Sequence, residues 1–277
     1  MKLTLAYSPC PNDTFAFHAM VHRLVNTYEL EFEVKLADVE QLNKSAFNEE
    51  YDICKMSYGA YFGLCDKYVM LRSGSALGFN NGPLLVHKAE KQPTPQKLAS
   101  YKIAIPGEHT TAALLLKTAY PQCKNLVPVL FSDIEEAVLS GEFDAGLLIH
   151  EGRFTYEKRG LKLIRDLGSY WHDTTGLPIP LGGIAIRREL LPYGKKINEI
   201  LLSSIIFAFE NPESSASYIG KFAKEMDPEV QKSHIELYVN EFTKDIGSVG
   251  KQAVEALYEK ALLTDFEIKK ITNLFIY

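Results

Sequence analysis

A histidine at the end of an apolar run is the first residue in this chain that could do chemistry. The segment 144–149 begins with Asp144 and continues as five apolar residues, and His150 follows it directly. An unbroken apolar run is typical of a strand covered on both faces, as in a parallel sheet. In open α/β sheets the ligand crevice lies beyond the carboxyl ends of the strands, where an imidazole could act as a base near neutral pH. From this segment alone, a histidine that only satisfies local hydrogen bonds is the alternative.

Hydroxyl side chains at two predicted strand-to-helix junctions are the other candidates. Ser57 follows a predicted strand at 53–56 and precedes a short predicted helix at 58–64, whereas Thr110 and Thr111 open another predicted helix. The first N–H groups of a helix, together with its dipole, favour a carboxylate or a phosphate. Such residues also cap helices without binding any ligand, so both interpretations stay open for each junction.

The elements that must position these residues alternate strand and helix from the start of the chain. Asn12 or Asp13 can cap the first helix, and Asp38 can cap the second. Residues 32–36 alternate apolar and charged side chains, which is typical of a half-buried strand near a sheet edge. This alternation of elements predicts an α/β fold. The predicted strands lie at 3–7, 32–36, 53–56, 84–87, 102–105, 126–131, 144–149, 161–164 and 184–186.

Two polar stretches divide these strands between two predicted lobes. Residues 88–95 contain two prolines and are expected to cross into a second lobe, and a loop at 169–183 is expected to cross back. The glycine-rich segment 72–83 matches no phosphate-loop motif and is predicted to be a flexible rim loop. Two lobes joined in this way enclose a cleft that closes on a small ligand like a hinge. The expected divisions are 1–88 and 176–277 for the first lobe and 89–175 for the second.

The last third of the chain is predicted to be helical scaffold. Its helical patterns lie at 197–208, 213–224, 228–240 and 249–261, and no carboxylate pair or nucleophile stands out in them. The apolar tail 274–277 is expected to pack on the chain itself, with a dimer contact as the alternative.

Composition and charge exclude several classes of protein. The 277 residues are 46% hydrophobic and 23% charged, and 30 basic against 35 acidic residues give a net charge of −5. No basic stripe is available for nucleic acid, and the first apolar run is too short for a membrane span or an export signal. Four cysteines without a CxxC pair or ligand-like spacing argue against zinc and against a disulfide framework. We therefore expect a cytoplasmic protein with reduced thiols and with no nucleic-acid or membrane partner.

Six short segments carry a family resemblance. They are SPCPNDTF at 8–15, KMSY at 55–58, LRSG at 71–74, PGEHTT at 106–111, LIHE at 148–151 and TGLP at 175–178. These segments resemble the 1,4-dihydroxy-6-naphthoate synthases of the futalosine route to menaquinone, from residue 3 to about residue 245. Met56 stands where leucine is expected, and the tail past residue 245 matches poorly. The resemblance implies the two-lobed fold of type II periplasmic binding proteins, each lobe a mainly parallel sheet flanked by helices.

The resemblance also implies an activity and a set of site residues. The family enzyme is a carbon-carbon lyase that acts on cyclic dehypoxanthine futalosine, a small-molecule carboxylate, without metal or cofactor. His150 would be the proton acceptor, and the enolate formed would expel the ribose-derived part of the substrate. The residues expected to hold the substrate are Lys55, Met56 and Ser57 from one lobe, and Thr110, Thr111 and Ala112 from the other.

Two other functions are compatible with the same fold. One is the chorismate dehydratase of the same pathway, although the PGEHTT and LIHE segments favour the naphthoate enzyme. The other is a small-carboxylate-binding or sensor module without catalysis, which His150 at a strand end and the missing export signal disfavour. The oligomeric state does not follow from the sequence.

Overall fold

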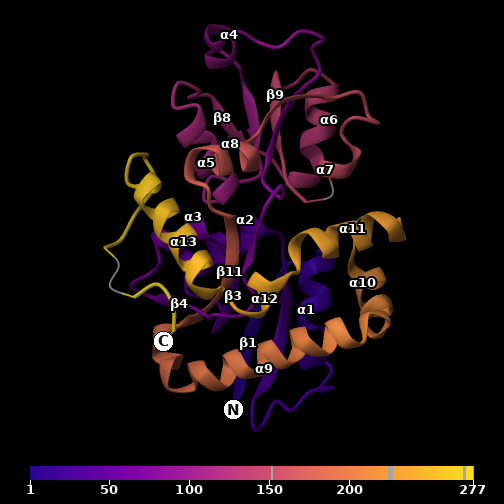
Figure 1. The fold of residues 1–277 in the computed structure, drawn as a ribbon, viewed down its shortest axis with the longest axis vertical. Coiled ribbons are helices and arrows are strands. Elements are labelled where there is room, and N and C mark those ends of the chain that lie inside the picture. Colours follow the sequence, from indigo (N-terminus) through magenta and orange to yellow (C-terminus); the bar gives the residue numbers. More distant parts are fainter. Residues whose placement is uncertain (151, 224–226, 271–272, 277) are drawn as a thin grey trace.

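Two β-sheets, one in each half of the molecule, organise the chain (Figure 1). The computed structural model describes residues 1–150, 152–223, 227–270 and 273–276. The strands of the first sheet, in the lower half of Figure 1, are β1 (Lys2–Tyr7), β2 (Glu31–Leu36), β3 (Ile53–Ser57), β4 (Tyr68–Met70), β5 (Ala76–Gly78) and β11 (Ile179–Arg187). Those of the second sheet are β6 (Leu84–His87), β7 (Ile103–Ile105), β8 (Leu126–Pro128), β9 (Ala145–Leu148) and β10 (Lys162–Asp166).

Helices pack around both sheets. The first half contains α1 (Pro11–Val21), α2 (Val39–Phe47), α3 (Tyr58–Phe62), α9 (Leu191–Glu210), α10 (Ala216–Phe222), α11 (Pro228–Tyr238), α12 (Glu241–Lys244) and α13 (Gly247–Ala261). The second half contains α4 (Pro95–Ala99), α5 (Thr111–Ala119), α6 (Ile134–Leu139), α7 (Gly152–Thr155) and α8 (Leu167–Thr175). Short 3₁₀ turns are η1 (Phe131–Asp133), η2 (Arg188–Leu190) and η3 (Pro212–Ser215). Within the described ranges, no helix combines the length and apolar composition needed to cross a bilayer.

The two-sheet α/β architecture predicted from the sequence is confirmed, but each sheet is mixed rather than mainly parallel. The first sheet has the order β2-β1-β3-β11-β4, with β5 also paired to β11, and the second has the order β10-β6-β9-β7-β8. β1 runs parallel to β2 and β3, and β7 runs parallel to β8 and β9. Antiparallel pairs arise at β11 and β6, because these strands enter their sheets directly from the other half. The buried strand expected before His150 is β9, in the middle of the second sheet.

The predicted helix caps have mixed outcomes. Asp38 caps α2 as predicted, because its carboxylate accepts hydrogen bonds from the backbone N–H groups of Glu40 and Gln41. Neither Asn12 nor Asp13 caps α1, which begins at Pro11 with Cys10 in the cap position and no side-chain cap. Proline suits this first helical position because its missing N–H has no intrahelical acceptor there. Asp13 is thereby left available for contacts outside its own helix.

The first crossing between the halves lies earlier than predicted. β6 was expected in the first lobe, with the crossing at 88–95, but β6 pairs with β9 and β10 in the second sheet. The chain therefore crosses at 79–83, and the polar segment 88–95 leads instead to α4 of the second half. A Cβ on Gly82 would lie 2.3 Å from the backbone of Gly168. Only glycine, which has no side chain, therefore fits at this point of the crossing. The division of the chain into separate folding domains stays a prediction.

The segment predicted as a loop at 72–83 is mostly irregular, as predicted, whereas the one at 169–183 is largely regular structure. The first contains β5, and the second is occupied by most of α8 and the start of β11. Asp166 caps α8 by accepting from the N–H groups of Gly168 and Ser169, and Gly176 ends the helix at φ +70°. Trp171 is 2% exposed, and its Nε1–H donates to the carbonyl of Pro178 at 3.0 Å. These side-chain contacts hold the proline-containing segment in a defined conformation as the chain returns to the first half.

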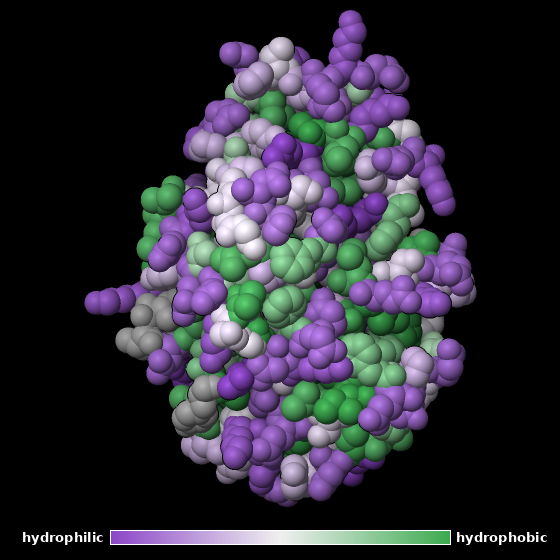
Figure 2. Space-filling view, viewed as in Figure 1, coloured by the Kyte–Doolittle hydropathy of each residue, from purple (hydrophilic) through white to green (hydrophobic). Residues whose placement is uncertain are grey.

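The core is continuous between the two halves. One cluster of buried residues includes Met56 from the first sheet, Leu147 from the second, and Trp171 from α8. On the face shown in Figure 2, apolar residues form several patches among polar ones, and one of these patches lies near the middle of the molecule. The C-terminal tail packs on its own chain as predicted, because Met70 donates to the carbonyl of Leu274 and Phe275 bridges to Met70. Residue 224, where the helix predicted at 213–224 ends, and residue 277, the last of the tail, lie outside the described residues.

Candidate active site

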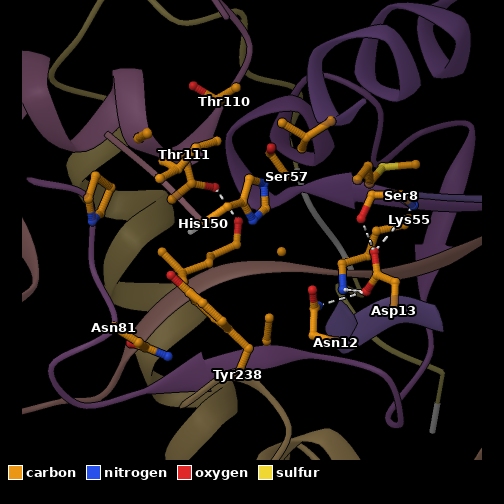
Figure 3. Close-up of a pocket in the computed structure, with 18 of the residues that line it drawn as sticks. Ser8, Asn12, Asp13, Lys55, Ser57, Asn81, Thr110, Thr111, His150 and Tyr238 are labelled. Atoms are coloured by element: carbon orange, nitrogen blue, oxygen red, sulfur yellow. Dashed lines mark hydrogen bonds and ion pairs between the residues drawn. The ribbon is translucent and has the colours of Figure 1, made fainter. Parts of the chain in front are cut away.

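A cavity lies between the two sheets, and its empty space, including the part open to solvent, is about 710 Å³. Figure 3 shows polar side chains from both halves directed into it. From the first half it is lined by Ser8, Asn12, Asp13, Val39, Leu42, Lys55, Met56, Ser57, Ala76, Leu181, Gly182 and Tyr238. From the second half and the first crossing it is lined by Asn81, Gly82, Pro83, Thr110, Thr111, Ala112, Ile149 and His150.

His150 stands two residues beyond β9 and is partly exposed at the cavity wall. Its backbone is in the left-handed region, with φ +54°, a conformation that turns the chain sharply at the strand end. Its ring lies 5.0 Å from the ring of Phe131 and 5.7 Å from that of His234, which is parallel to it within 10°. The imidazole is therefore held among aromatic rings at the carboxyl edge of the second sheet.

A buried ion pair lies in the cavity wall on the side of the first sheet. Lys55 Nζ lies 2.8 Å from Asp13 Oδ1, and their side chains are 12% and 4% exposed. The Asp13 carboxylate also accepts from the hydroxyl of Ser8 at 2.7 Å and from Nδ2 of Asn12 at 2.9 Å. These bonds offset the cost of burying the carboxylate. The Lys55 ammonium has three N–H donors, so the pair with Asp13 leaves donor capacity for a ligand.

Ser57 ends β3 but does not cap α3 with its side chain. Its hydroxyl oxygen accepts from Nδ2 of Asn43 at 3.1 Å, and its backbone N–H donates to Oδ1 of Asn43 at 2.9 Å. These two bonds fix the orientation of the serine at the cavity wall. Because the oxygen is already accepting, the hydroxyl proton is the group that Ser57 offers to a ligand.

The start of α5 supplies backbone donors from the second half. Thr110 caps the helix by accepting from the N–H of Ala113, and the Thr111 hydroxyl donates to the carbonyl of Leu181 at 2.6 Å. Both hydroxyls are therefore used within the protein. Among the described residues, the backbone N–H groups of Thr111 and Ala112 have no acceptor. With the positive end of the helix dipole, they form a site suited to an anionic group.

Glu40 connects α2 in the first half to the loop before α5 in the second. Its carboxylate accepts from the backbone N–H of Glu108 at 3.1 Å and of His109 at 3.3 Å. Gly107 makes this approach possible, because a Cβ there would lie 2.3 Å from the carboxylate. Nδ2 of Asn43 also donates to the Glu40 carboxylate at 3.4 Å. The same amide group therefore bonds both to Ser57 and to the carboxylate that joins the two halves.

Burial raises the pKa of Glu40 above the ordinary value of 4.5, and the nearby His109 opposes this only in part. The folded state therefore holds the Glu40 proton more tightly than the unfolded chain does. We expect the stability of the wild type relative to Glu40→Gln to be greatest below the unfolded pKa and to decline as pH rises through the folded pKa. Urea unfolding of both proteins from about pH 4 to pH 8 measures this difference. A difference that grows with pH would contradict the prediction.

All seven residues predicted for the site line this one cavity: Lys55, Met56, Ser57, Thr110, Thr111, Ala112 and His150. The structure brings them together, whereas their roles stay predictions. Glu151 of the LIHE segment lies outside the described residues. Sequence reasoning missed Asn12 and Asp13, which were interpreted as caps although they follow β1 at the same sheet edge as Ser57. It also missed Tyr238, because α11 was interpreted as scaffold.

The family described as "Menaquinone biosynthesis" matches residues 3–262 of this chain. The chain belongs to this menaquinone-biosynthesis family. The match extends beyond residue 245, where the resemblance was expected to end. A curated relative from Thermus thermophilus, named 1,4-dihydroxy-6-naphtoate synthase, is 42% identical over 260 residues, which cover 94% of this chain and 93% of the relative. A Streptomyces coelicolor protein of the same name is 40% identical over 265 residues, covering 94% and 92%.

Solved structures place this member of the menaquinone-biosynthesis family among periplasmic-binding-protein-like folds. A crystal structure of an Archaeoglobus fulgidus protein superposes with a TM-score of 0.88 at 40% identity, covering 95% of this chain and 97% of that one. The alkanesulfonate-binding protein SsuA of Xanthomonas axonopodis has a TM-score of 0.69 at 13% identity, covering 99% and 96%. At that identity the likeness shows the fold alone. The two-lobed fold implied by the resemblance is thereby confirmed.

Proposed function

We propose that this protein is a 1,4-dihydroxy-6-naphthoate synthase that cleaves a carbon-carbon bond of cyclic dehypoxanthine futalosine. The observation that carries the proposal is the position of His150 in the same cavity as anion-binding groups from both halves. The names of the two curated relatives support the same reaction. As part of this proposal we place the enzyme in the cytoplasm, where its four buried cysteines stay reduced.

In the proposed reaction the neutral His150 ring removes a proton from a carbon next to a carbonyl group. The enolate that forms then expels the ribose-derived part, which leaves with the electron pair of the broken carbon-carbon bond and takes up a proton from the His150 imidazolium. The ring that remains becomes aromatic. The N–H groups of Thr111 and Ala112 hold either the substrate carboxylate or the developing oxyanion, and Ser57 with Lys55 holds the opposite end. The apolar part of the lining excludes water and thereby protects the enolate from protonation by solvent.

The purified protein is expected to convert the cyclic substrate to a naphthalene product, which ultraviolet absorbance detects directly. Chorismate serves as the control substrate, because a chorismate dehydratase would consume it instead. Binding of the cyclic substrate by calorimetry without turnover would identify a sensor module and contradict the proposal. Turnover of chorismate alone would contradict it as well.

A further inference from the structure

We infer that His234 is a positioning residue for His150, supplying the neutral aromatic face on which the His150 imidazolium forms. This inference rests on the proposed function. His234 lies on α11, is fully buried and stands behind the cavity wall rather than in the lining. Its ring is 5.7 Å from the His150 ring and parallel to it within 10°. The helix that supplies it comes from the first half, whereas His150 comes from the second.

A chain of hydrogen bonds fixes which nitrogen of His234 carries the proton. Nδ2 of Asn12 donates to the Asp13 carboxylate, so Oδ1 of Asn12 is the atom that faces His234. His234 Nε2 lies 2.9 Å from that oxygen and must therefore donate to it. The series of hydrogen bonds continues to Lys55, whose Nζ donates to Oδ1 of Asp13 at 2.8 Å. The buried ion pair thus holds Asn12, and Asn12 holds His234 as the Nε2–H tautomer.

His234 stays neutral while His150 can change its charge. Burial, assisted by the Lys55 ammonium and by His150 whenever that ring is protonated, holds the pKa of His234 well below its usual range. Of the two stacked rings, only His150 reaches the cavity, so it is the one that takes the substrate proton. A cation over a neutral aromatic face is attracted to it, whereas two charged imidazoles would repel. The neutral His234 ring therefore stabilises the charge that appears on His150 during the reaction.

Two substitutions of His234 distinguish the effect of its aromatic ring from that of merely filling the buried space with a side chain. His234→Phe keeps an aromatic face, and His234→Leu removes it. We expect kcat to fall about tenfold in His234→Leu and to stay within about threefold of the wild type in His234→Phe. KM should change little in either variant, because His234 does not line the cavity. His87→Leu is the matched control: this histidine is 1% exposed at the opposite end of the strand pair β6–β9.

A spectroscopic measurement that does not depend on enzyme activity tests the same role of His234. Histidine ¹⁵N spectra of the wild type should identify His234 as the Nε2–H tautomer at neutral pH. The pKa of His150, followed in the same spectra, should be lower in His234→Leu than in the wild type or in His234→Phe. The charged groups on the neighbouring elements are already paired and unchanged by these variants: Lys55 with Asp13, Glu135 with Arg159, and Arg153 with Asp166.

The outcomes distinguish this inference from the proposed function. A wild-type protein that does not convert the cyclic substrate overturns the function, and the ¹⁵N titration then still decides the role of His234. An active wild type with equal kcat losses in His234→Phe and His234→Leu overturns the inference alone. Equal losses in His87→Leu and His234→Leu likewise reduce His234 to a structural role. Thermal unfolding of each variant checks that the compared proteins are folded.

Discussion

Replacing His150 with glycine is expected to lower kcat by roughly a hundredfold or more, because the general base of the proposed reaction is removed. Glycine is the informative replacement at this position. The His150 backbone has φ +54°, which glycine adopts without a steric penalty and alanine does not. His150→Gly should therefore keep the turn after β9 and isolate the loss of the ring. His150→Ala should lose as much activity and also some stability.

The decisive measurement is steady-state turnover with and without added imidazole. The cavity vacated by the ring should admit free imidazole, which then restores part of the activity of His150→Gly as a diffusible base. His22→Ala is the matched control, because His22 is the C-cap residue that follows α1 and is absent from the cavity lining. Near-normal turnover of His150→Gly without imidazole would remove His150 from the role of base.

Replacing Lys55 with methionine is expected to destabilise the protein by about 3 kcal/mol. The substitution leaves the Asp13 carboxylate, 4% exposed, without its cationic partner. Ser8 and Asn12 still donate to that carboxylate, which places the expected loss at the lower end of the range for a broken buried pair. Substrate binding should weaken as well, because Lys55 lines the cavity.

A double-mutant cycle separates the lost ion pair from other effects of the methionine. Asp13→Asn combined with Lys55→Met removes both charges, so the double variant should be less destabilised than Lys55→Met alone. Urea unfolding of the four proteins provides the coupling free energy. Additive losses would show that the two side chains do not interact in solution. Lys117→Met is the control, since Lys117 pairs with an exposed Asp265 at the surface and should cost less than about 1 kcal/mol.

The sequence alone predicted part of the site because one local rule applies to it. His150, Ser57 and Thr111 all follow strands at the point where ligands bind in open α/β sheets. Asp13 obeys the same rule after β1, yet its position at the start of a helix also fits a cap, and local sequence does not separate the two. The ion pair with Lys55, 42 residues away, decides between them.

The errors in the fold have a related origin. Apolar residues 84–87 correctly predict a strand, but no local pattern states which sheet a strand joins. The segment 169–183 contains prolines that suggest a loop, whereas the cap from Asp166 and the burial of Trp171 turn it into a helix and a strand. Tertiary contacts thus override a local preference that is worth little free energy by itself.

The sequence by itself determined most strands, most helices and the residue types at the strand ends, because apolar periodicity and helix caps act between near neighbours. Only the tertiary structure decided what meets inside the cavity. His234 bonds to Asn12 across 222 residues of chain and stacks on His150 of the other half. Any of the six histidines other than His150 could have filled that place as far as local patterns go. The packing of α11 against α1 selects His234, since contacts between distant elements depend on how the whole core closes.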